Sequence, residues 1–245
     1  MPQSYVIIPA YNEGQNLPVV LEQLKELSST LPLSVVVVND GSRDNTLEAA
    51  ESFRDKMDLE IVNHPVNMGV PMTFYDGLVA AAKRAQPGDC IFIIEGDGTS
   101  DLKCMPEMAR RVYGGDDVVV ASRYIEGGGY VNFPWQRTSG SWGVNMVLSV
   151  FFHVRGLTDY TIFYRAYRAE IVQRALEHFG SGFTTTKSFA ANLEVLLRVL
   201  PFSHRFSEVP LLYDYGLKKS QSKMNPVKTL REYQGLIVKR LLRRI

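Results

Sequence analysis

An apolar run that ends in two carboxylates decides the fold. It spans residues 90–99 and reads Cys90-Ile91-Phe92-Ile93-Ile94-Glu95-Gly96-Asp97-Gly98-Thr99. Consecutive apolar residues without alternation are typical of a strand that is buried on both faces, as in a parallel sheet. Polar residues follow at once, and we therefore expect them at the carboxyl end of that strand.

Four more short stretches rich in apolar residues lie in the first half of the chain, one of them interrupted by Glu60. They span residues 5–8, 35–38, 59–62 and 118–120. Stretches with helical spacing separate them, at about residues 17–27, 46–56, 71–84 and 106–113. Strands that alternate with helices predict an α/β fold, with a mostly parallel central sheet and helices on both of its faces.

The pattern changes after Arg123. Helices are expected at about residues 137–154, 169–178 and 187–200, and a late strand at 208–212. Glycines 127–129 predict a mobile loop, and the polar stretch 217–225 predicts another. A final amphipathic helix begins near Pro226, with an apolar stripe of Leu230, Tyr233, Ile237 and Leu241.

The composition is that of a globular protein with a sizeable core. Of 245 residues, 45% are hydrophobic and 22% are charged, and two cysteines are too few for a disulfide framework. No apolar stretch is long enough to cross about 30 Å of hydrocarbon, and the first residues lack the pattern of a signal peptide. We therefore expect a cytoplasmic chain that is soluble or lies at a membrane surface.

The net charge of +1 hides an asymmetry. Residues 1–120 contain 9 Lys/Arg and 18 Asp/Glu, whereas residues 121–245 contain 18 and 8. Charges scattered over solvated faces are the simpler explanation, but so complete a split weakens it. It favours an acidic half that holds a cation and a basic half that meets an anion or an anionic surface.

Carboxylates recur at three predicted strand ends, in Glu13, in Asp40 and in the pair Glu95 and Asp97. Helix capping and turns explain one such residue, and explain all of them less well. In extended backbone Glu95 and Asp97 point to the same side, and like charges this close require a proton or a cation between them. Oxygen ligands suit Mg²⁺ or Mn²⁺, with Thr99 as a further donor.

A metal that binds phosphates suggests a nucleotide ligand, yet the usual nucleotide loops are missing. The sequence contains neither G-x-x-x-x-G-K-[ST] nor G-x-G-x-x-G after a strand. Phosphate binding then depends on the metal rather than on a glycine-rich loop. This points away from kinases, P-loop hydrolases and dehydrogenases, and towards nucleotide-sugar transferases.

Short motifs at the strand ends and in the second half carry a family resemblance. They span residues 6–13, 37–42, 95–97, 121–124, 132–137, 164–168 and 222–224. The first three resemble the opening, second-strand and metal motifs of family 2 glycosyltransferases with the GT-A fold. The later ones narrow the resemblance to polyprenyl-phosphate mannose synthases, the dolichol-phosphate mannosyltransferase group. It extends from about Tyr5 to Met224.

The resemblance implies a Rossmann-like GT-A domain over residues 1–215, then a basic acceptor loop and an amphipathic helix over 216–245. It implies that the nucleotide sugar contacts Pro9, Tyr11, Glu13, Val38, Asp40 and Gly96. Metal ligands would be Glu95, Asp97 and Thr99. The acceptor's phosphate would meet Arg123, Arg137, Ser141 and Lys223, the last from a closing loop. The catalytic residues would be Asp97, Arg123 and Arg137.

Three positions depart from the family pattern. Glu95 stands where the metal motif usually has Asp, so that its longer side chain moves the carboxylate outward. The acidic pair after the second strand is reduced to Asn39 and Asp40. Phe163 occupies a position where glycine is common, and could narrow the acceptor groove.

The expected reaction is inverting transfer of a hexose, mannose from GDP-mannose above all, to the phosphate of a polyprenyl or dolichyl phosphate. A phosphate monoester is already an anion, with a second pKa of about 6, and attacks without a general base. We expect the chain at the cytoplasmic face of a membrane, held there by the basic final helix, alone or beside a membrane-protein partner, and not on nucleic acid. That helix could instead dock on the sheet.

Several alternatives stay open. A related enzyme could use UDP-glucose, or a hydroxyl acceptor, for which Asp159 is either a general base or a helix cap. A protein of another class would bind nucleotide sugars without catalysis. Arg165 and Arg168 are interpreted as structural residues that pack a helix on the sheet, the isolated histidines receive no chemical role, and Trp135 and Trp142 either line a lipid path or pack.

Overall fold

The strands and helices come from a computed structural model that describes residues 2–132, 135–217 and 223–242, apart from the side chains of Gln136 and Arg137. The strands are β1 (Ser4–Ala10), β2 (Leu33–Asn39), β3 (Leu59–Asn63), β4 (Cys90–Ile93), β5 (Val118–Ser122), β6 (Gly129–Val131), β7 (Arg165–Arg168), β8 (Phe206–Pro210) and β9 (Leu212–Asp214). The helices are α1 (Leu17–Leu27), α2 (Thr46–Glu51), α3 (Val70–Arg84), α4 (Met105–Tyr113), α5 (Trp135–Phe152), α6 (Ala169–Phe179), α7 (Ala191–Val199) and α8 (Pro226–Leu241).

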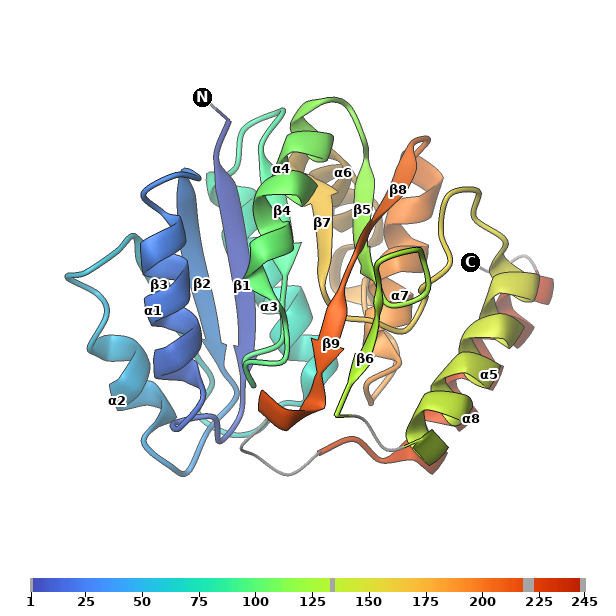
Figure 1. Ribbon diagram of the computed structural model, residues 1–245, viewed down its shortest axis with the longest axis horizontal. Coiled ribbons are helices and arrows are strands. Elements are labelled where there is room, and N and C mark those ends of the chain that lie inside the picture. The colour runs from blue at the N-terminus through green and yellow to red at the C-terminus, as the bar shows by residue number, and fades with distance from the viewer. Residues whose placement is uncertain (1, 133–134, 218–222, 243–245) are drawn as a thin grey trace.

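The central sheet confirms the expected parallel α/β architecture. Within the described residues it has seven strands in the order β3-β2-β1-β4-β7-β5-β8 (Figure 1). All neighbours pair in parallel except β7, which runs antiparallel to both β4 and β5. The inner strands β1, β2, β4 and β5 are almost entirely buried, as their uninterrupted apolar runs predict.

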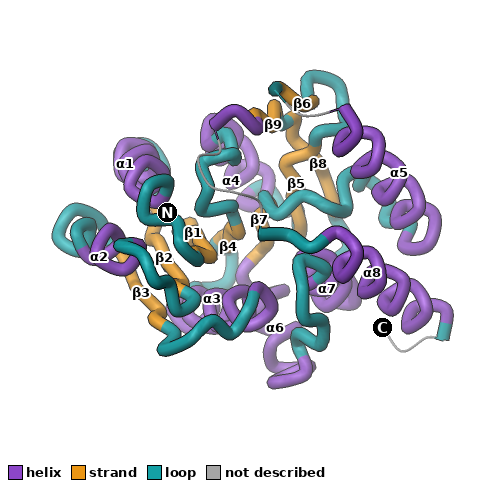
Figure 2. The backbone as a smooth tube through the Cα atoms, turned by 90° about the horizontal axis from the view of Figure 1, so that it is seen from below, coloured by secondary structure: helices purple, strands orange, loops and turns teal. Residues whose placement is uncertain are grey.

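Helices cover both faces of this sheet. Figure 2 shows α1 and α4 on one face and α3, α6 and α7 on the other, while α5 and α8 lie side by side beyond the β8 edge. Close packing on the α3 face depends on Gly77, where an added Cβ would come within 2.5 Å of Ile7. A glycine is therefore needed inside α3, despite its cost to helix stability.

Strand β7 was not expected. Our interpretation of Arg165 and Arg168 as structural residues that pack a helix on the sheet is confirmed for Arg165, which hydrogen-bonds Asn192 on α7. Both lie on this four-residue strand, between β4 and β5. Arg165 is fully buried, and its guanidinium donates to the Asn192 carbonyl at 2.6 Å and the Tyr160 carbonyl at 2.7 Å. A charged residue that is held by carbonyl oxygens in this way interrupts the apolar pattern by which buried strands are identified.

A small second sheet lies beside the main one. It pairs β6 with β9 in parallel and sets Tyr130 opposite Tyr213. The glycine stretch 127–129, expected to be a loop, thus ends in a strand at Gly129. The predicted late strand at 208–212 resolves into the end of β8 and the start of β9.

The final helix begins at Pro226, as expected, but its buried face differs from the predicted stripe. Tyr233 and Leu236 are buried, whereas Leu230 and Leu241 are 43% and 65% exposed. Helix α8 therefore docks through Tyr233 and Leu236 and leaves other apolar side chains outside. Across the described residues, none of the helices combines the length and the apolar character that crossing a bilayer requires.

Candidate active site

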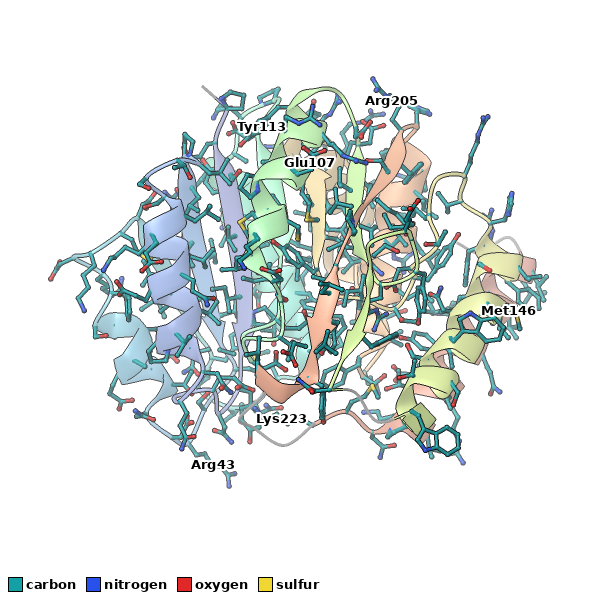
Figure 3. All side chains as sticks on the ribbon, in the orientation of Figure 1. Arg43, Glu107, Tyr113, Met146, Arg205 and Lys223 are labelled. Atoms are coloured by element: carbon teal, nitrogen blue, oxygen red, sulfur yellow. The ribbon has the colours of Figure 1, made fainter. Side chains whose placement is uncertain are left out.

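A pocket of about 360 Å³ opens at the carboxyl ends of β1, β2 and β4. This is where ligands bind in open α/β sheets. It brings together most of the residues that the sequence pointed to, namely Pro9, Tyr11, Glu13, Asp40, Glu95, Gly96, Asp97 and Lys223. Figure 3 shows Lys223 at the same edge of the molecule as Arg43, which follows β2, and opposite to Tyr113 and Glu107.

Glu95 and Asp97 line the same pocket in the turn that follows β4. Gly96 between them lies so close to β1 that an added Cβ would come within 2.9 Å of the Pro9 carbonyl oxygen. The glycine therefore lets the acidic turn pack against the opening motif. Residue types with a larger side chain at position 96 would push the two carboxylates away from the β1 end.

Neighbouring hydroxyls hold both carboxylates. The Thr99 hydroxyl donates to Asp97 Oδ1 at 2.5 Å, and the Ser100 hydroxyl donates to Glu95 Oε2 at 2.6 Å. Thr99 is 1% exposed and is not among the residues that line the pocket, so within the described part of the chain it supports Asp97 from behind. Its role as a metal ligand stays a prediction.

The donor set fits a hard divalent cation. Two carboxylates on one pocket wall provide oxygen ligands, and Mg²⁺ typically takes one or two carboxylates together with substrate phosphates. In the described residues, no group of three or more acidic, histidine or cysteine side chains could hold a metal alone. A metal bound here would complete its coordination with water and with phosphate oxygens of a ligand.

Asp40 organises the loop on the other side of the pocket. Its carboxylate accepts hydrogen bonds from the backbone N–H groups of Met68, at 2.7 Å, and Gly69, at 2.9 Å. The ring of His64, buried at 6% exposure, lies 2.8 Å from Asp40 and 3.1 Å from Asp76. Asp40 thus shapes the pocket through backbone contacts, and His64 is a supporting residue that its isolated place in the sequence gave no signal to find.

Lys223 reaches the opening motif from the far end of the chain. Its ammonium lies 2.6 Å from Glu13 Oε1, hydrogen-bonds the carbonyl oxygen of Tyr11, and sits 5.6 Å from the centre of the Tyr11 ring. Asn16 donates to the second oxygen of Glu13 at 2.7 Å. The segment after β9 therefore forms part of the pocket wall.

Arg123 forms a buried ion pair with Asp159. The guanidinium donates to both carboxylate oxygens at 2.7 Å and to the Thr161 hydroxyl at 2.6 Å. Burial alone raises the pKa of Asp159, but the Arg123 charge and its hydrogen bonds hold that pKa below its ordinary value. Asp159 is fully buried and already paired, so it is poorly placed to act as a general base.

Three tyrosines surround the Arg123 side chain. Its guanidinium carbon lies 5.4 Å from the ring of Tyr124, 5.2 Å from Tyr130 and 5.8 Å from Tyr213. The hydroxyl of Ser141, on α5, is 3.0 Å from the hydroxyls of Tyr124 and Tyr130. Arg123 and Ser141, both expected at the acceptor's phosphate, are thus brought into one cluster, but Lys223 binds elsewhere, at Glu13.

Tyr213 connects this cluster with the acidic turn, and sequence reasoning missed it. Burial, and then the negative charges of Glu95 and Asp97, raise the pKa of Tyr213 well above its ordinary value. Its hydroxyl, like that of an ordinary tyrosine with a pKa of about 10, is protonated at neutral pH and can donate a hydrogen bond. Its place on β9, opposite Tyr130, becomes visible only through the pairing of two short strands.

Three other positions that the sequence singled out lie in different surroundings. Val38 is fully buried in β2 and does not line the pocket, so its contact with a nucleoside stays a prediction. The backbone of Arg137 lies in the first turn of α5, and its side chain is outside the described residues. Phe163 lines the pocket and stacks on Phe189, with ring centres 5.6 Å apart.

Comparison with known sequences relates this site to sugar transfer. Residues 5–176 match the family described as Glycosyl transferase family 2. The chain is 26% identical over 230 residues to "Dolichol-phosphate mannosyltransferase" of Pyrococcus furiosus, covering 93% of this chain and 60% of that protein. It is 29% identical over 213 residues to "Undecaprenyl-phosphate mannosyltransferase" of Micrococcus luteus, covering 84% and 82%.

Solved structures support the fold. Glucosyl-3-phosphoglycerate synthase from Mycobacterium tuberculosis, crystallised with Mn²⁺ and UDP, superposes with a TM-score of 0.66 at 16% identity, covering 99% of this chain and 80% of that one. The GT-A architecture expected from the sequence is therefore confirmed. The match to the family model extends from β1 into α6, and the shared architecture agrees with it. This match shows that the chain belongs to glycosyl transferase family 2.

Proposed function

We propose that this protein transfers a hexose, mannose from GDP-mannose above all, to the phosphate of a polyprenyl phosphate, with inversion and with Mg²⁺ or Mn²⁺. The observation that carries the proposal is the position of Glu95 and Asp97 on the pocket that the opening motif lines. Relatives named as polyprenyl-phosphate mannosyltransferases support the acceptor class. One of them is longer than this chain, which spans 60% of its length.

Glu95 and Asp97 are the residues that would hold the metal, which would neutralise charge on the donor diphosphate. Pro9, Tyr11 and Glu13 from β1 and the turn after it would contact the nucleoside. The loop at Asn67 and Gly69, which Asp40 holds in place, closes the other side. This arrangement leaves phosphate recognition to cations, in keeping with the absence of a glycine-rich phosphate loop from the sequence.

The acceptor phosphate supplies its own nucleophile. Its oxygen attacks the anomeric carbon, the bond from that carbon to the nucleoside diphosphate breaks, and the leaving diphosphate takes the electron pair. No proton has to be removed, which suits a cluster in which Asp159 is buried against Arg123. Arg123, Arg137 and Ser141 would hold the acceptor, and in-line attack on an α-linked donor gives a β-linked product.

A lipid acceptor calls for a membrane-facing surface, which we assign to α5 and α8. Helix α5 exposes Trp135, Trp142, Met146 and Val150, and α8 exposes Val227, Leu230, Val238 and Leu241. The two helices lie side by side (Figure 2), and Arg231 and Arg240 on α8 add positive charge. Apolar side chains beside basic ones suit the cytoplasmic face of an anionic bilayer. The acceptor loop and α8 then form the 216–245 segment after a catalytic domain of residues 1–215.

The direct test offers a panel of radiolabelled nucleotide sugars, among them GDP-mannose and UDP-glucose, with Mn²⁺ and a short polyprenyl phosphate. The matched control acceptor is the corresponding polyprenol, which has a hydroxyl in place of the phosphate. We expect label from GDP-mannose in the lipid phase with the phosphate alone. Label on the polyprenol, or nucleotide binding without any transfer, would overturn the proposal.

A further inference from the structure

The segment from Thr185 to Phe189 carries one wall of the pocket, and two glutamates from different helices hold it. Lys187, Ser188 and Phe189 all line the pocket. Behind them Glu194, on α7 and 1% exposed, accepts hydrogen bonds from the backbone N–H groups of Thr185, at 2.8 Å, and Thr186, at 2.9 Å. The wall is therefore anchored to the core on one side.

The other anchor comes from α8. Glu232 accepts a hydrogen bond from the backbone N–H of Lys187 at 3.0 Å and from the Ser188 hydroxyl at 2.5 Å. Lys228, one turn earlier on α8, donates to the Lys187 carbonyl at 2.6 Å. Figure 2 shows α8 next to α7, consistent with these contacts.

The Ser188 hydroxyl also links Glu232 to the aromatic part of the wall. It accepts a hydrogen bond from the Ala190 backbone N–H at 3.2 Å, next to Phe189. Phe189 stacks on Phe163, and the Phe163 ring meets Phe74 edge-on at 5.3 Å between centres. A shift of residues 187 and 188 would therefore displace the aromatic pair that bounds the pocket.

We propose that Glu232 is a positioning residue of the donor pocket, which holds the Lys187–Phe189 wall for binding of a nucleotide sugar. This inference rests on the proposed function and extends it, because none of the motifs that carry the resemblance includes Glu232. Helix α8 would then have two roles. One of its faces exposes apolar side chains, and another face carries Glu232, which fixes the pocket wall. Charge-assisted hydrogen bonds to a carboxylate are strong enough for this task.

The test compares Glu232→Ala with Glu232→Gln and with Gln234→Ala, an exposed position on the same helix. We expect Glu232→Ala to raise the KM for the donor about tenfold, because the hydrogen bonds from the Lys187 N–H and the Ser188 hydroxyl are lost, with kcat changed much less. Glutamine still accepts from Lys187 and can pair with the Ser188 hydroxyl, so Glu232→Gln should stay within about threefold of the parent. If Glu232→Ala fails to fold, Ser188→Ala takes its place, because it removes the hydroxyl that donates to Glu232 and accepts from the Ala190 N–H but keeps the hydrogen bond from the Lys187 N–H to Glu232.

A second readout needs no sugar donor. Amide hydrogen exchange in the ligand-free protein should accelerate over residues 185–190 in Glu232→Ala and remain unchanged in Gln234→Ala. Parental exchange and parental KM in Glu232→Ala would overturn the inference, as would equal damage from Glu232→Gln. If the parent protein transfers no sugar, the proposed function fails, while the exchange experiment still decides whether Glu232 holds the wall.

Discussion

Lys223 and Glu13 form an ion pair with 2.6 Å between Nζ and Oε1, although 210 positions separate them in the sequence. The pair joins the segment that follows β9 to the end of β1, where the opening motif lies. It adds a third lysine to Lys187 and Lys228 on a pocket that also carries four carboxylates, Glu13, Asp40, Glu95 and Asp97. For the proposed reaction, which has two phosphate-bearing substrates, this cation is positioned to attract either one.

Lys223→Met should therefore lower kcat/KM by about tenfold or more, because the ammonium that balances phosphate charge is lost. The free energy of unfolding should change by less than about 1 kcal/mol, since the Lys223 side chain is 34% exposed and water screens the pair. Steady-state kinetics and urea denaturation measure the two quantities. Lys83→Met, at an exposed position on α3, is the control. Unchanged kcat/KM in Lys223→Met would remove Lys223 from the site.

Asp159→Asn should destabilise the protein by about 3–5 kcal/mol at pH 7, because it leaves the buried Arg123 guanidinium without its carboxylate. Burial raises the pKa of Asp159, yet Arg123 holds it below the ordinary value, so the folded state binds this proton less readily than the unfolded state. The stabilisation is complete above the unfolded pKa of about 3.9 and is lost as the pH falls through the lower folded pKa.

Urea denaturation at several pH values measures this difference. The gap between the parent protein and Asp159→Asn should be constant near neutrality and should shrink below about pH 4. Asp116→Asn is the matched control, because its partner Arg205 is 65% exposed and that pair adds little. A difference in unfolding free energy that grows as the pH falls would contradict the assignment of Asp159 as the ionised partner of Arg123.

Arg165→Met should cost about 3–5 kcal/mol of unfolding free energy, and Arg168→Met, on the same strand, less than about 1 kcal/mol. Arg165 is fully buried and serves the carbonyls of Asn192 and Tyr160, which the variant leaves without a donor. Arg168 is 24% exposed and lies 3.5 Å from Asp117. Thermal or urea denaturation of both variants checks the contrast, and equal effects would refute it.

Val150→Asp should weaken binding to anionic vesicles by about tenfold or more, because it places a negative charge on the apolar surface that we assign to the membrane. Val150 is 72% exposed on α5, and the equally apolar Val19 on α1, 47% exposed at the other end of the sheet, supplies the control Val19→Asp. Cosedimentation with vesicles measures both variants. Binding should fall with added salt, which screens Arg231 and Arg240. Equal losses in the two variants would contradict a membrane role for α5.

The first half of the fold could be predicted from the sequence because its signals are local. The runs at 35–38 and 90–94 are long, apolar and bounded by turn residues, and the structure makes strands β2 and β4 of them. Glu95 and Asp97 follow directly and could be assigned to one pocket by the same logic. The sequence pattern predicts the strands correctly where a strand is buried on both faces, because such burial requires apolar residues.

The rest depends on contacts between distant residues. Strand β7 carries two arginines, and the buried Arg165 depends on acceptors in distant residues, the backbone carbonyls of Tyr160 and Asn192 and the side-chain oxygen of Asn192. Tyr213 comes near the acidic turn because β9 pairs with β6, and Glu232 reaches the pocket because α8 folds back beside α7. None of these contacts produces a periodic pattern in the sequence.

The central claim is that Asp97 helps to hold a divalent ion that binds the donor diphosphate. Titration calorimetry of GDP with Mn²⁺, with and without a chelator, tests it in the parent protein, in Asp97→Ala and in the control Asp101→Ala. We predict chelator-sensitive binding that falls about 100-fold or more in Asp97→Ala and persists in Asp101→Ala. Binding that survives the chelator, or that Asp97→Ala retains at parental strength, would contradict the account.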